Sequence, residues 1–356
     1  MNIATQVTAH LTPTHIHPED FIFQNILKKG RSPIEAVDEY LTDGRASAKF
    51  IAGLVAQLRP VAAPLEILEF ASGFGRVSRH LKQAFPKDNI TACDIHRGAV
   101  EFTEHVLGVE AILSTTQPKE FYSAQNFDVI FAISFFTHMP KRTWAEWLGA
   151  LTRALKPNGL LIFTTHGKPS LPVICRNVVL DDEGYWFSPL SEQTDLDTAE
   201  YGTTVTSFNF VQRHCNDLGL HLNRFVEAGA GYQDLFAVTK PITYSANLTA
   251  SEPMAIDGGT LAIPVKVTNS GSEPWDSGYS IGGRLFGPEG YLVREFRAHL
   301  PSIIGPSEKT EVDLMTSLNS LPSGEYSLTI DVVKEGHFWF SDAGSAPTTL
   351  TLESGD

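Results

Sequence analysis

The feature that most constrains the fold is the segment at residues 67–76, ILEFASGFGR, in which an apolar run ends in an acid and then passes through two closely spaced glycines. This pattern predicts a strand, a tight turn and the start of a helix. Small residues at such a turn allow a ligand to lie against the backbone, where a Cβ atom would collide with it. Nineteen residues after Gly75 a second apolar run ends in Asp94, whose carboxylate can accept hydrogen bonds from both hydroxyls of a ribose. The two segments predict a nucleoside-binding site at the carboxyl ends of adjacent parallel strands.

Strands and helices are predicted to alternate through the central part of the chain. Strands are expected at 65–70, 89–94, 109–113, 128–133 and 159–165, and helices at 76–85, 97–106 and 141–155. Such alternation is typical of parallel strands joined by crossover helices. A helix from Ser207 to Gly219 and two strands at 221–226 and 234–239, joined by a turn at 228–231, follow. This last pair predicts a closing antiparallel hairpin.

The region from Glu69 to Gly167 resembles the class I S-adenosylmethionine-dependent methyltransferases. Their first motif reads roughly D/E-x-G-x-G-x-G, and here it is EFASGFG, with Ala71 at the position of the first glycine. FDVIFAIS at 127–134 is similar to the fourth strand of the family and its exit loop. LKPNGLLIF at 155–163 is similar to the end of a helix, a turn and the fifth strand. The closing hairpin separates this sheet from that of nicotinamide-binding Rossmann proteins.

The resemblance implies an α/β Rossmann-like fold with a seven-stranded sheet, a helical cap before it, and S-adenosylmethionine as cofactor. Residues 33–58 are expected to form the cap helices, whereas residues 1–30 are polar and predicted to be irregular. The implied cofactor-binding residues are Glu69, Ala71, Ser72, Gly73, Phe74, Gly75, Asp94, Ile95, Ile133 and Ser134.

Two histidines follow predicted strands at the edge of the sheet that faces the ligand. His138 follows the fourth strand and His166 follows the fifth. Histidine titrates near neutral pH and is the most frequent general base, so we expect one of the two to deprotonate the methyl acceptor. A structural role for His138, as a hydrogen-bonding group that holds its loop, is the alternative.

A long segment at 167–203 interrupts the alternation on the cofactor side of the sheet, where a substrate lid is expected. It places Tyr185, Trp186 and Tyr201 near acids, a combination that suits a polyhydroxylated ligand such as a sugar. We therefore predict these three aromatic residues to bind substrate. The alternative is a loop that buries its own aromatic side chains.

The pattern changes after Lys240-Pro241, where helical periodicity stops. Strands expected at 260–269, 279–287, 291–298, 308–315, 324–333 and 347–352 predict an all-β, immunoglobulin-like sandwich. It resembles the β-sandwich domains attached to bacterial polysaccharide exporters and glycosyltransferases. A structural appendage or a dimerisation module, giving a homo-oligomer, is the alternative. The expected domains are an N-terminal cap (1–60), a methyltransferase domain (61–240) and the sandwich (241–356).

Charge and composition restrict the partners. The 356 residues carry a formal net charge of −14, so neither half supplies the basic patch that nucleic-acid binding requires. We expect no membrane insertion, because no apolar run approaches the roughly 18 residues that a span needs. Three scattered cysteines (Cys93, Cys175 and Cys215) form no metal-ligand pattern and indicate reduced thiols in a cytoplasm.

The function that these predictions favour is S-adenosylmethionine-dependent O-methylation of a sugar or another small-molecule or glycan hydroxyl, without a metal. The alternative is a non-catalytic glycan-binding or assembly protein in which the C-terminal region binds the ligand.

Overall fold

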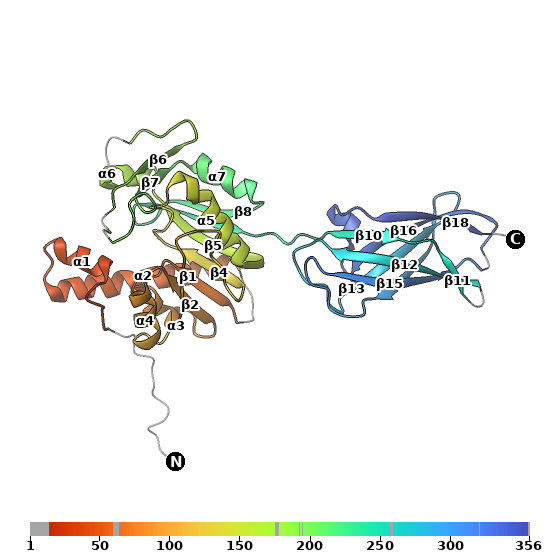
Figure 1. The fold of residues 1–356 in the computed structure, drawn as a ribbon, viewed down its shortest axis with the longest axis horizontal. Coiled ribbons are helices and arrows are strands. Elements are labelled where there is room, and N and C mark those ends of the chain that lie inside the picture. The colour runs from red at the N-terminus through yellow and green to blue at the C-terminus, as the bar shows by residue number, and fades with distance from the viewer. Residues whose placement is uncertain are drawn as a thin grey trace, which may run out of the picture. The chain divides into compact units, whose positions relative to one another are not determined.

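The structure is a computed structural model that describes residues 14–59, 64–174, 178–191, 193, 195–256, 259–319 and 321–354. Cys175 lies outside these residues. The chain forms two compact units, of which the first ends at Pro241 and the second begins at Ile242. Figure 1 labels their helices and strands.

The first unit is built on a seven-stranded sheet in the order β3-β2-β1-β4-β5-β9-β8. Its strands are β1 (Glu66–Phe70), β2 (Asn89–Asp94), β3 (Glu110–Leu113), β4 (Phe127–Ala132), β5 (Leu155–Thr165), β8 (His221–Ala230) and β9 (Gln233–Thr239). β9 runs antiparallel to both of its neighbours, β5 and β8. The predicted seven-stranded sheet with a closing hairpin is thus confirmed. The hairpin turn is tighter than expected, because β8 extends to Ala230 and only Gly231 and Tyr232 separate the two strands.

Helices cover both faces of this sheet. On one face α2 (Pro33–Leu58), α3 (Ser78–Ala84) and α4 (Arg97–His105) pack on the sheet through residues such as Ile51, Leu81 and Phe102. On the other face α5 (Lys141–Ala154) and α7 (Phe208–Asp217) do the same through Trp144 and Phe210. Burial of one apolar face of each helix against the β-branched and aromatic residues of the strands stabilises the three-layer arrangement.

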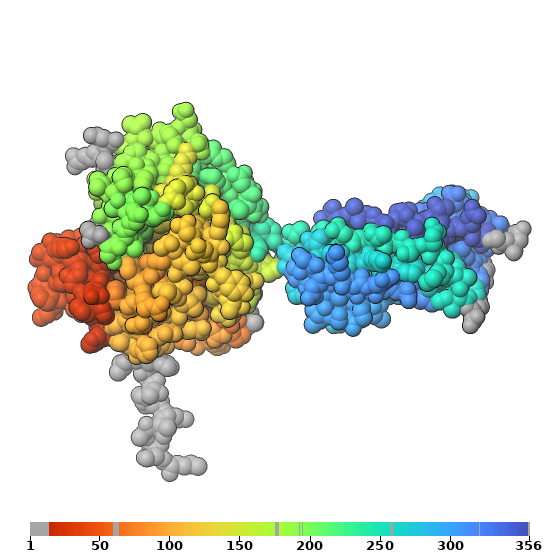
Figure 2. Space-filling view, viewed as in Figure 1, coloured from red at the N-terminus to blue at the C-terminus, as the bar shows by residue number. Residues whose placement is uncertain are grey.

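The N-terminal segment is more regular than the sequence predicted. α1 (Phe21–Lys28) lies within the stretch expected to be irregular, and its N-cap Asp20 accepts a hydrogen bond from the backbone of Phe23. The cap helix α2 is one continuous helix, which begins with a capping box formed by Ser32 and Glu35. These caps satisfy backbone N–H groups that the first turn of a helix leaves without partners. Figure 2 shows the N-terminal helices (red) on the same side of the unit as the insertion after β5 (light green).

The insertion after β5 is not an irregular loop. It contains a 3-10 helix (Lys168–Ser170), the short helix α6 (Leu171–Ile174), and a hairpin of β6 (Tyr185–Ser188) and β7 (Thr203–Thr206). The sequence did not predict the hairpin, because each strand is only four residues long.

The second unit is all-β. One sheet contains β10 (Ala246–Ala250), β11 (Met254–Ile256), β12 (Thr260–Asn269) and β15 (Lys309–Ser317). The other contains β13 (Tyr279–Phe286), β14 (Leu292–His299), β16 (Gly324–Lys334), β17 (Phe338–Trp339) and β18 (Thr348–Ser354). Buried residues of both sheets, such as Val265 and Ile330, belong to one hydrophobic cluster.

Candidate functional site

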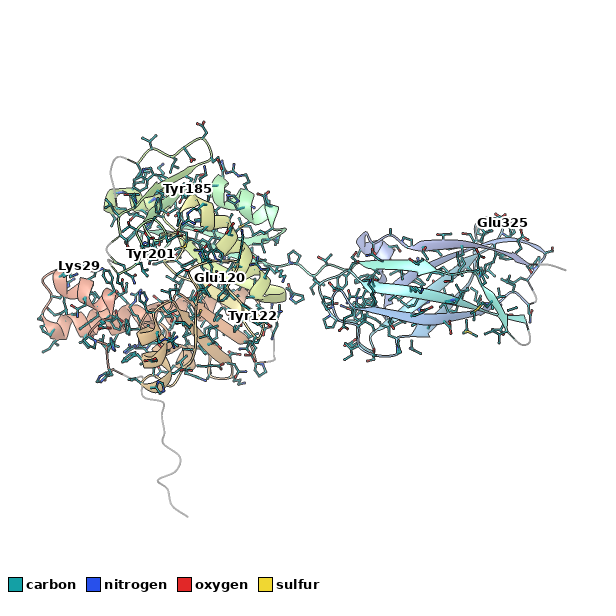
Figure 3. All side chains as sticks on the ribbon, in the orientation of Figure 1. Lys29, Glu120, Tyr122, Tyr185, Tyr201 and Glu325 are labelled. Atoms are coloured by element: carbon teal, nitrogen blue, oxygen red, sulfur yellow. The ribbon has the colours of Figure 1, made fainter. Side chains whose placement is uncertain are left out.

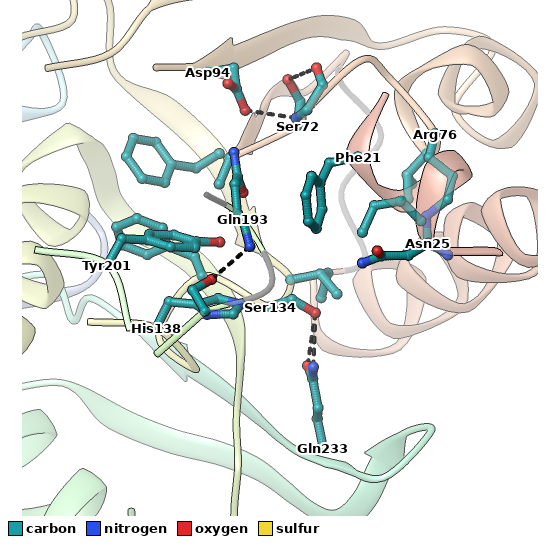
Figure 4. A pocket seen from close by; sticks show the side chains of 18 of the residues that line it. Phe21, Asn25, Ser72, Arg76, Asp94, Ser134, His138, Gln193, Tyr201 and Gln233 are labelled. Atoms are coloured by element: carbon teal, nitrogen blue, oxygen red, sulfur yellow. Dashed lines mark hydrogen bonds between the residues drawn. The ribbon is translucent and has the colours of Figure 1, made fainter. Parts of the chain in front are cut away.

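A large cavity opens at the carboxyl edge of the seven-stranded sheet, with a volume of about 1240 Å³. The loops that follow β1, β2, β4 and β5 line it from the sheet. Residues of α1, α2, the insertion and the β8–β9 turn line it from the other sides. Figure 4 shows Asp94 and Ser72, His138 and Tyr201, and Phe21 and Asn25 around the same space. This is the edge at which open α/β sheets bind ligands.

The glycine turn forms one wall of the cavity. Gly73 has a φ of +55°, and a Cβ atom added to it would have no neighbouring atom within 4 Å. Its backbone therefore faces open cavity that a cofactor can occupy. Gly75 has a different role, because its Cβ would lie 2.4 Å from Leu107 Cδ1. Gly75 does not line the cavity, and its φ of +74° favours glycine at this position of the turn.

Two non-glycine residues at the same edge also adopt left-handed backbone conformations. Ala71, which occupies the position of the family's first glycine, and Ser134, which follows β4, both have a φ of +59°. Such conformations cost free energy for residues with a Cβ atom and gather at functional sites. Both residues line the cavity, as do Ile95 and Ile133.

Asp94 joins the turn to the end of β2. Its Oδ2 accepts a hydrogen bond from the backbone N–H of Gly73 at 2.7 Å, and its Oδ1 accepts one from the backbone N–H of His96 at 3.0 Å. The His96 ring connects the end of β2 to the insertion. Its Nδ1 lies 2.9 Å from Asp94 Oδ1, and its Nε2 lies 3.0 Å from Asp195 Oδ2 of the insertion. The hydrogen bond to Asp94 is the main cause of the raised pKa of His96. The sequence did not single out His96 as a link between the cofactor acid and the insertion.

Glu69 is a buried carboxyl group at the end of β1. Ser78 Oγ donates a hydrogen bond of 2.6 Å to its Oε2. Burial outweighs this bond and raises the pKa of Glu69 to about 8. A cationic ligand beside it would stabilise its ionised form. The sulfonium and ammonium groups of S-adenosylmethionine therefore suit this wall, and the open Gly73 backbone and Asp94 suit its nucleoside.

The two predicted histidines lie together on the opposite wall, with ring centroids 6.4 Å apart. His138 Nδ1 is 2.7 Å from the carbonyl oxygen of Gly202, and His166 Nδ1 is 3.0 Å from that of Thr204. A carbonyl oxygen can only accept, so in each neutral ring Nδ1 carries the proton and Nε2 is the basic nitrogen. Burial and the neighbouring His138 lower the pKa of His166 to about 4, which keeps its ring neutral at physiological pH.

β7 holds both histidine loops in place. The backbone N–H groups of Gly202, Thr204 and Thr206 donate to the carbonyl oxygens of His138, Thr137 and His166, respectively. One segment of the insertion therefore fixes both the backbone position and the tautomer of each histidine. Sequence reasoning found the histidines but not this strand.

Of the three aromatic residues predicted to bind substrate, only Tyr201 lines the cavity. Tyr201 lines the cavity, and its ring stacks on that of His138 at 4.3 Å. Tyr185 is buried, packs against Phe210 and donates its hydroxyl to the carbonyl oxygen of Met139. Neither Tyr185 nor Trp186 lines the cavity, because the β6–β7 hairpin directs them elsewhere. In Figure 3, Tyr201 is labelled nearer to the N-terminal helices than Tyr185 is.

A network of polar side chains connects β9 to β5 and to the loop after β4 at the edge of the cavity. Gln233, at the start of β9, accepts a hydrogen bond from Thr164 Oγ1 at 2.6 Å and pairs with the hydroxyl of Ser134. Figure 4 shows the Ser134–Gln233 pair. No sequence pattern pointed to Gln233, because only the closing hairpin brings it to the loop after β4.

Comparison with known proteins identifies the fold around this cavity. Residues 68–161 match the family model of a methyltransferase domain. The chain contains a methyltransferase domain. The strand order, the antiparallel β9, the glycine turn and Asp94 mark it as a class I, S-adenosylmethionine-dependent domain.

The curated relatives of the methyltransferase domain include two malonyl-[acyl-carrier protein] O-methyltransferases. That of Halalkalibacterium halodurans is 33% identical over 110 residues, which cover 29% of this chain and 40% of the relative. That of Anoxybacillus flavithermus is 31% identical over 114 residues, which cover 31% of this chain and 42% of the relative. The chain thus spans less than half of the length of these relatives. Among solved structures, an S-adenosylmethionine-dependent methyltransferase from Clostridium acetobutylicum aligns with a TM-score of 0.42 and 15% identity, over 55% of this chain and 90% of that one.

Two further features concern the described residues alone. Within the described ranges no group of three or more His, Cys, Asp and Glu side chains is arranged to hold a metal ion. Of the helices that the structure describes, none has the length and apolar character to span a bilayer.

Proposed function

We propose that this protein transfers a methyl group from S-adenosylmethionine to a hydroxyl group of a sugar, a glycan or another small molecule. The observation that supports this proposal most directly is that two histidines, the glycine turn and Asp94 line one cavity. His138 and His166 lie on one wall, and Gly73 and Asp94 lie on the other.

Bound S-adenosylmethionine supplies an electrophilic methyl group. Asp94 and the backbone of Gly73 would hold the nucleoside, and an ionised Glu69 would stabilise the positive charge of the cofactor. His166 or His138 would accept the hydroxyl proton of the acceptor at Nε2, while its Nδ1–H donates to the carbonyl oxygen of Thr204 or Gly202, respectively. Holding acceptor and base in the cavity supplies orientation, which lowers the barrier by several kcal/mol in well-aligned systems.

The names of the curated relatives suggest a second acceptor, a malonyl group on an acyl-carrier protein. A malonyl group presents a carboxylate, and its binding requires a cation on the acceptor side. Arg76 and Lys29 are the only Arg or Lys residues among the described residues that line the cavity, whereas nine Asp and Glu residues line it. This balance favours a hydroxyl acceptor over a carboxylate.

The C-terminal unit has nine described strands, β10 to β18, in two sheets that share one hydrophobic cluster. We infer that it serves glycan assembly, in line with its resemblance to modules of polysaccharide exporters and glycosyltransferases. Binding of the isolated unit to a glycan array tests this role, and a monomer–dimer shift of the same unit without glycan binding would support the dimerisation alternative.

Titration calorimetry with S-adenosylmethionine tests the methyltransferase proposal. The wild-type protein should bind the cofactor, and NAD should not compete. Asp94→Ala removes a charge-assisted acceptor, so we expect a loss of roughly 1.5–3 kcal/mol in binding free energy. Asp88→Ala is the control, because Asp88 also accepts a backbone hydrogen bond but lies away from the cavity. Equal affinities for wild type and Asp94→Ala would remove Asp94 from the cofactor site.

A further inference from the structure

The cavity is larger than one cofactor requires. Drug-sized ligands occupy pockets of about 300–1,000 Å³, whereas this cavity measures about 1240 Å³. The residues predicted to bind the cofactor line one part of it. The remaining part is bounded by α1, α2, α6, the insertion and the β8–β9 turn, which come together only in the folded unit.

Exposed apolar side chains gather around this remaining part. Five of the large hydrophobic residues with at least 40% of their surface exposed line the cavity, namely Ile22, Phe50, Val173, Leu190 and Tyr232. Each comes from a different segment. Single exposed apolar residues are ordinary on protein surfaces, but their convergence on one cavity is typical of a surface that an apolar ligand covers.

The charge of the cavity disfavours one class of ligand. Glu39 and Asp43 of α2 and Asp197 and Glu200 of the insertion line it. Arg31 pairs with Glu39 and Arg142 with Glu200, so the repulsion of an anionic acceptor comes mainly from the exposed Asp43 and Asp197, and salt weakens it. Neutral and cationic acceptors do not meet this barrier.

Polar residues also line the cavity. Ser134 and Gln233 line it together with the two histidines, and they form a hydrogen-bonded chain with the buried Thr164. Hydroxyl and amide groups of this kind exchange hydrogen bonds with the hydroxyl groups of a ligand. The cavity therefore combines polar groups near the histidines with exposed apolar side chains at its rim.

We propose that the acceptor is an amphipathic molecule without negative charge, whose hydroxylated head reaches His138 and His166 and whose apolar body lies on the rim formed by Ile22, Val173 and Leu190. This inference rests on the proposed function and specifies its substrate class. Each methylene group that the rim buries should improve binding by about fourfold, the factor that corresponds to the transfer free energy of one methylene.

The test measures binding of three probes to the full chain saturated with S-adenosylhomocysteine: methyl glucoside, hexyl glucoside and hexyl glucuronide. We expect hexyl glucoside to bind at least about tenfold more tightly than methyl glucoside, which requires burial of only two methylene groups. Hexyl glucuronide, which has the same apolar chain and an added carboxylate, should bind more weakly than hexyl glucoside. Equal binding of the two neutral glycosides, tighter binding of the glucuronide, or no binding of hexyl glucoside would each overturn the inference.

Rim variants provide a second measurement. Leu190→Ser and Val173→Ser should each reduce the ratio of hexyl to methyl glucoside affinity by several fold. Val179→Ser is the matched control, because Val179 is 80% exposed in the same insertion but does not line the cavity. An unchanged ratio in both rim variants contradicts the assignment of the rim.

The same titrations separate this inference from the proposed function. Failure of the protein to bind S-adenosylhomocysteine overturns both. Normal binding of S-adenosylhomocysteine without any preference for the hexyl chain overturns only the amphipathic acceptor.

Discussion

Substitution of Gly73 by alanine tests whether the glycine turn contacts the cofactor. The left-handed backbone conformation destabilises a folded residue that has a Cβ atom by roughly 1–2 kcal/mol. Alanine also lowers the conformational entropy of the unfolded chain, which offsets about 0.4–1 kcal/mol of this loss. No atom lies within 4 Å of the added methyl group, so we expect no clash and a net loss of about 1 kcal/mol in the free energy of unfolding. For a unit of this size that loss lowers Tm by roughly 2–4 °C.

Gly219→Ala is the matched control. Gly219 follows α7, has a φ of +66°, has no atom within 4 Å of an added Cβ, and does not line the cavity. Its substitution should lower Tm by the same amount. The two variants should differ only in cofactor binding, because the methyl group at Gly73 occupies space that the cofactor fills.

Thermal shift and calorimetry with S-adenosylmethionine measure the difference. At a concentration of 100 times the wild-type Kd, the ligand should stabilise the wild type and Gly219→Ala by about 2.7 kcal/mol. If Gly73→Ala binds about tenfold more weakly, the same concentration stabilises it by only about 1.4 kcal/mol. A Gly73→Ala variant that shows the expected fall in Tm but keeps the wild-type Kd would refute contact between the turn and the cofactor.

Three further predictions concern the base and the domain boundary. His166→Ala should leave the Kd for S-adenosylmethionine unchanged and lower kcat by about 10² to 10⁴, and His138→Ala is the paired variant that identifies the base if the larger loss occurs there. The fall of kcat on the acidic side should occur near pH 4 rather than near pH 6.5, because the lowered pKa of His166 keeps its basic form populated down to about pH 4. A fall near pH 6.5 that disappears in His166→Gln would contradict a buried, neutral His166. A fragment that ends at Pro241 should remain folded and bind the cofactor, because the backbone of Lys240 is hydrogen-bonded to Asn158 and Gly159 in the first unit. Aggregation of the fragment would show that the second unit is needed for its stability.

The sequence by itself determined the sheet and the position of the glycine turn and Asp94 at its edge. The strands at 65–70 and 89–94 and the turn between them could be predicted, because hydrophobic runs, glycine spacing and a terminal acid are local properties of the chain. The same holds for the two histidines, since each lies in the loop after a strand whose end must lie at the ligand edge.

Only the tertiary structure decided which side chains meet across the cavity. Gly75 looked equivalent to Gly73 in the sequence, yet only Gly73 lines the cavity. Tyr185 and Tyr201 looked alike, but the short β6–β7 hairpin buries the first and stacks the second on His138. The tautomers of His138 and His166, the pKa of His166 and the pairing of Gln233 with Ser134 all depend on contacts between segments far apart in the chain. Hydrogen bonding and desolvation act through space, and one chain read residue by residue does not show which distant backbone carbonyl will face a given ring.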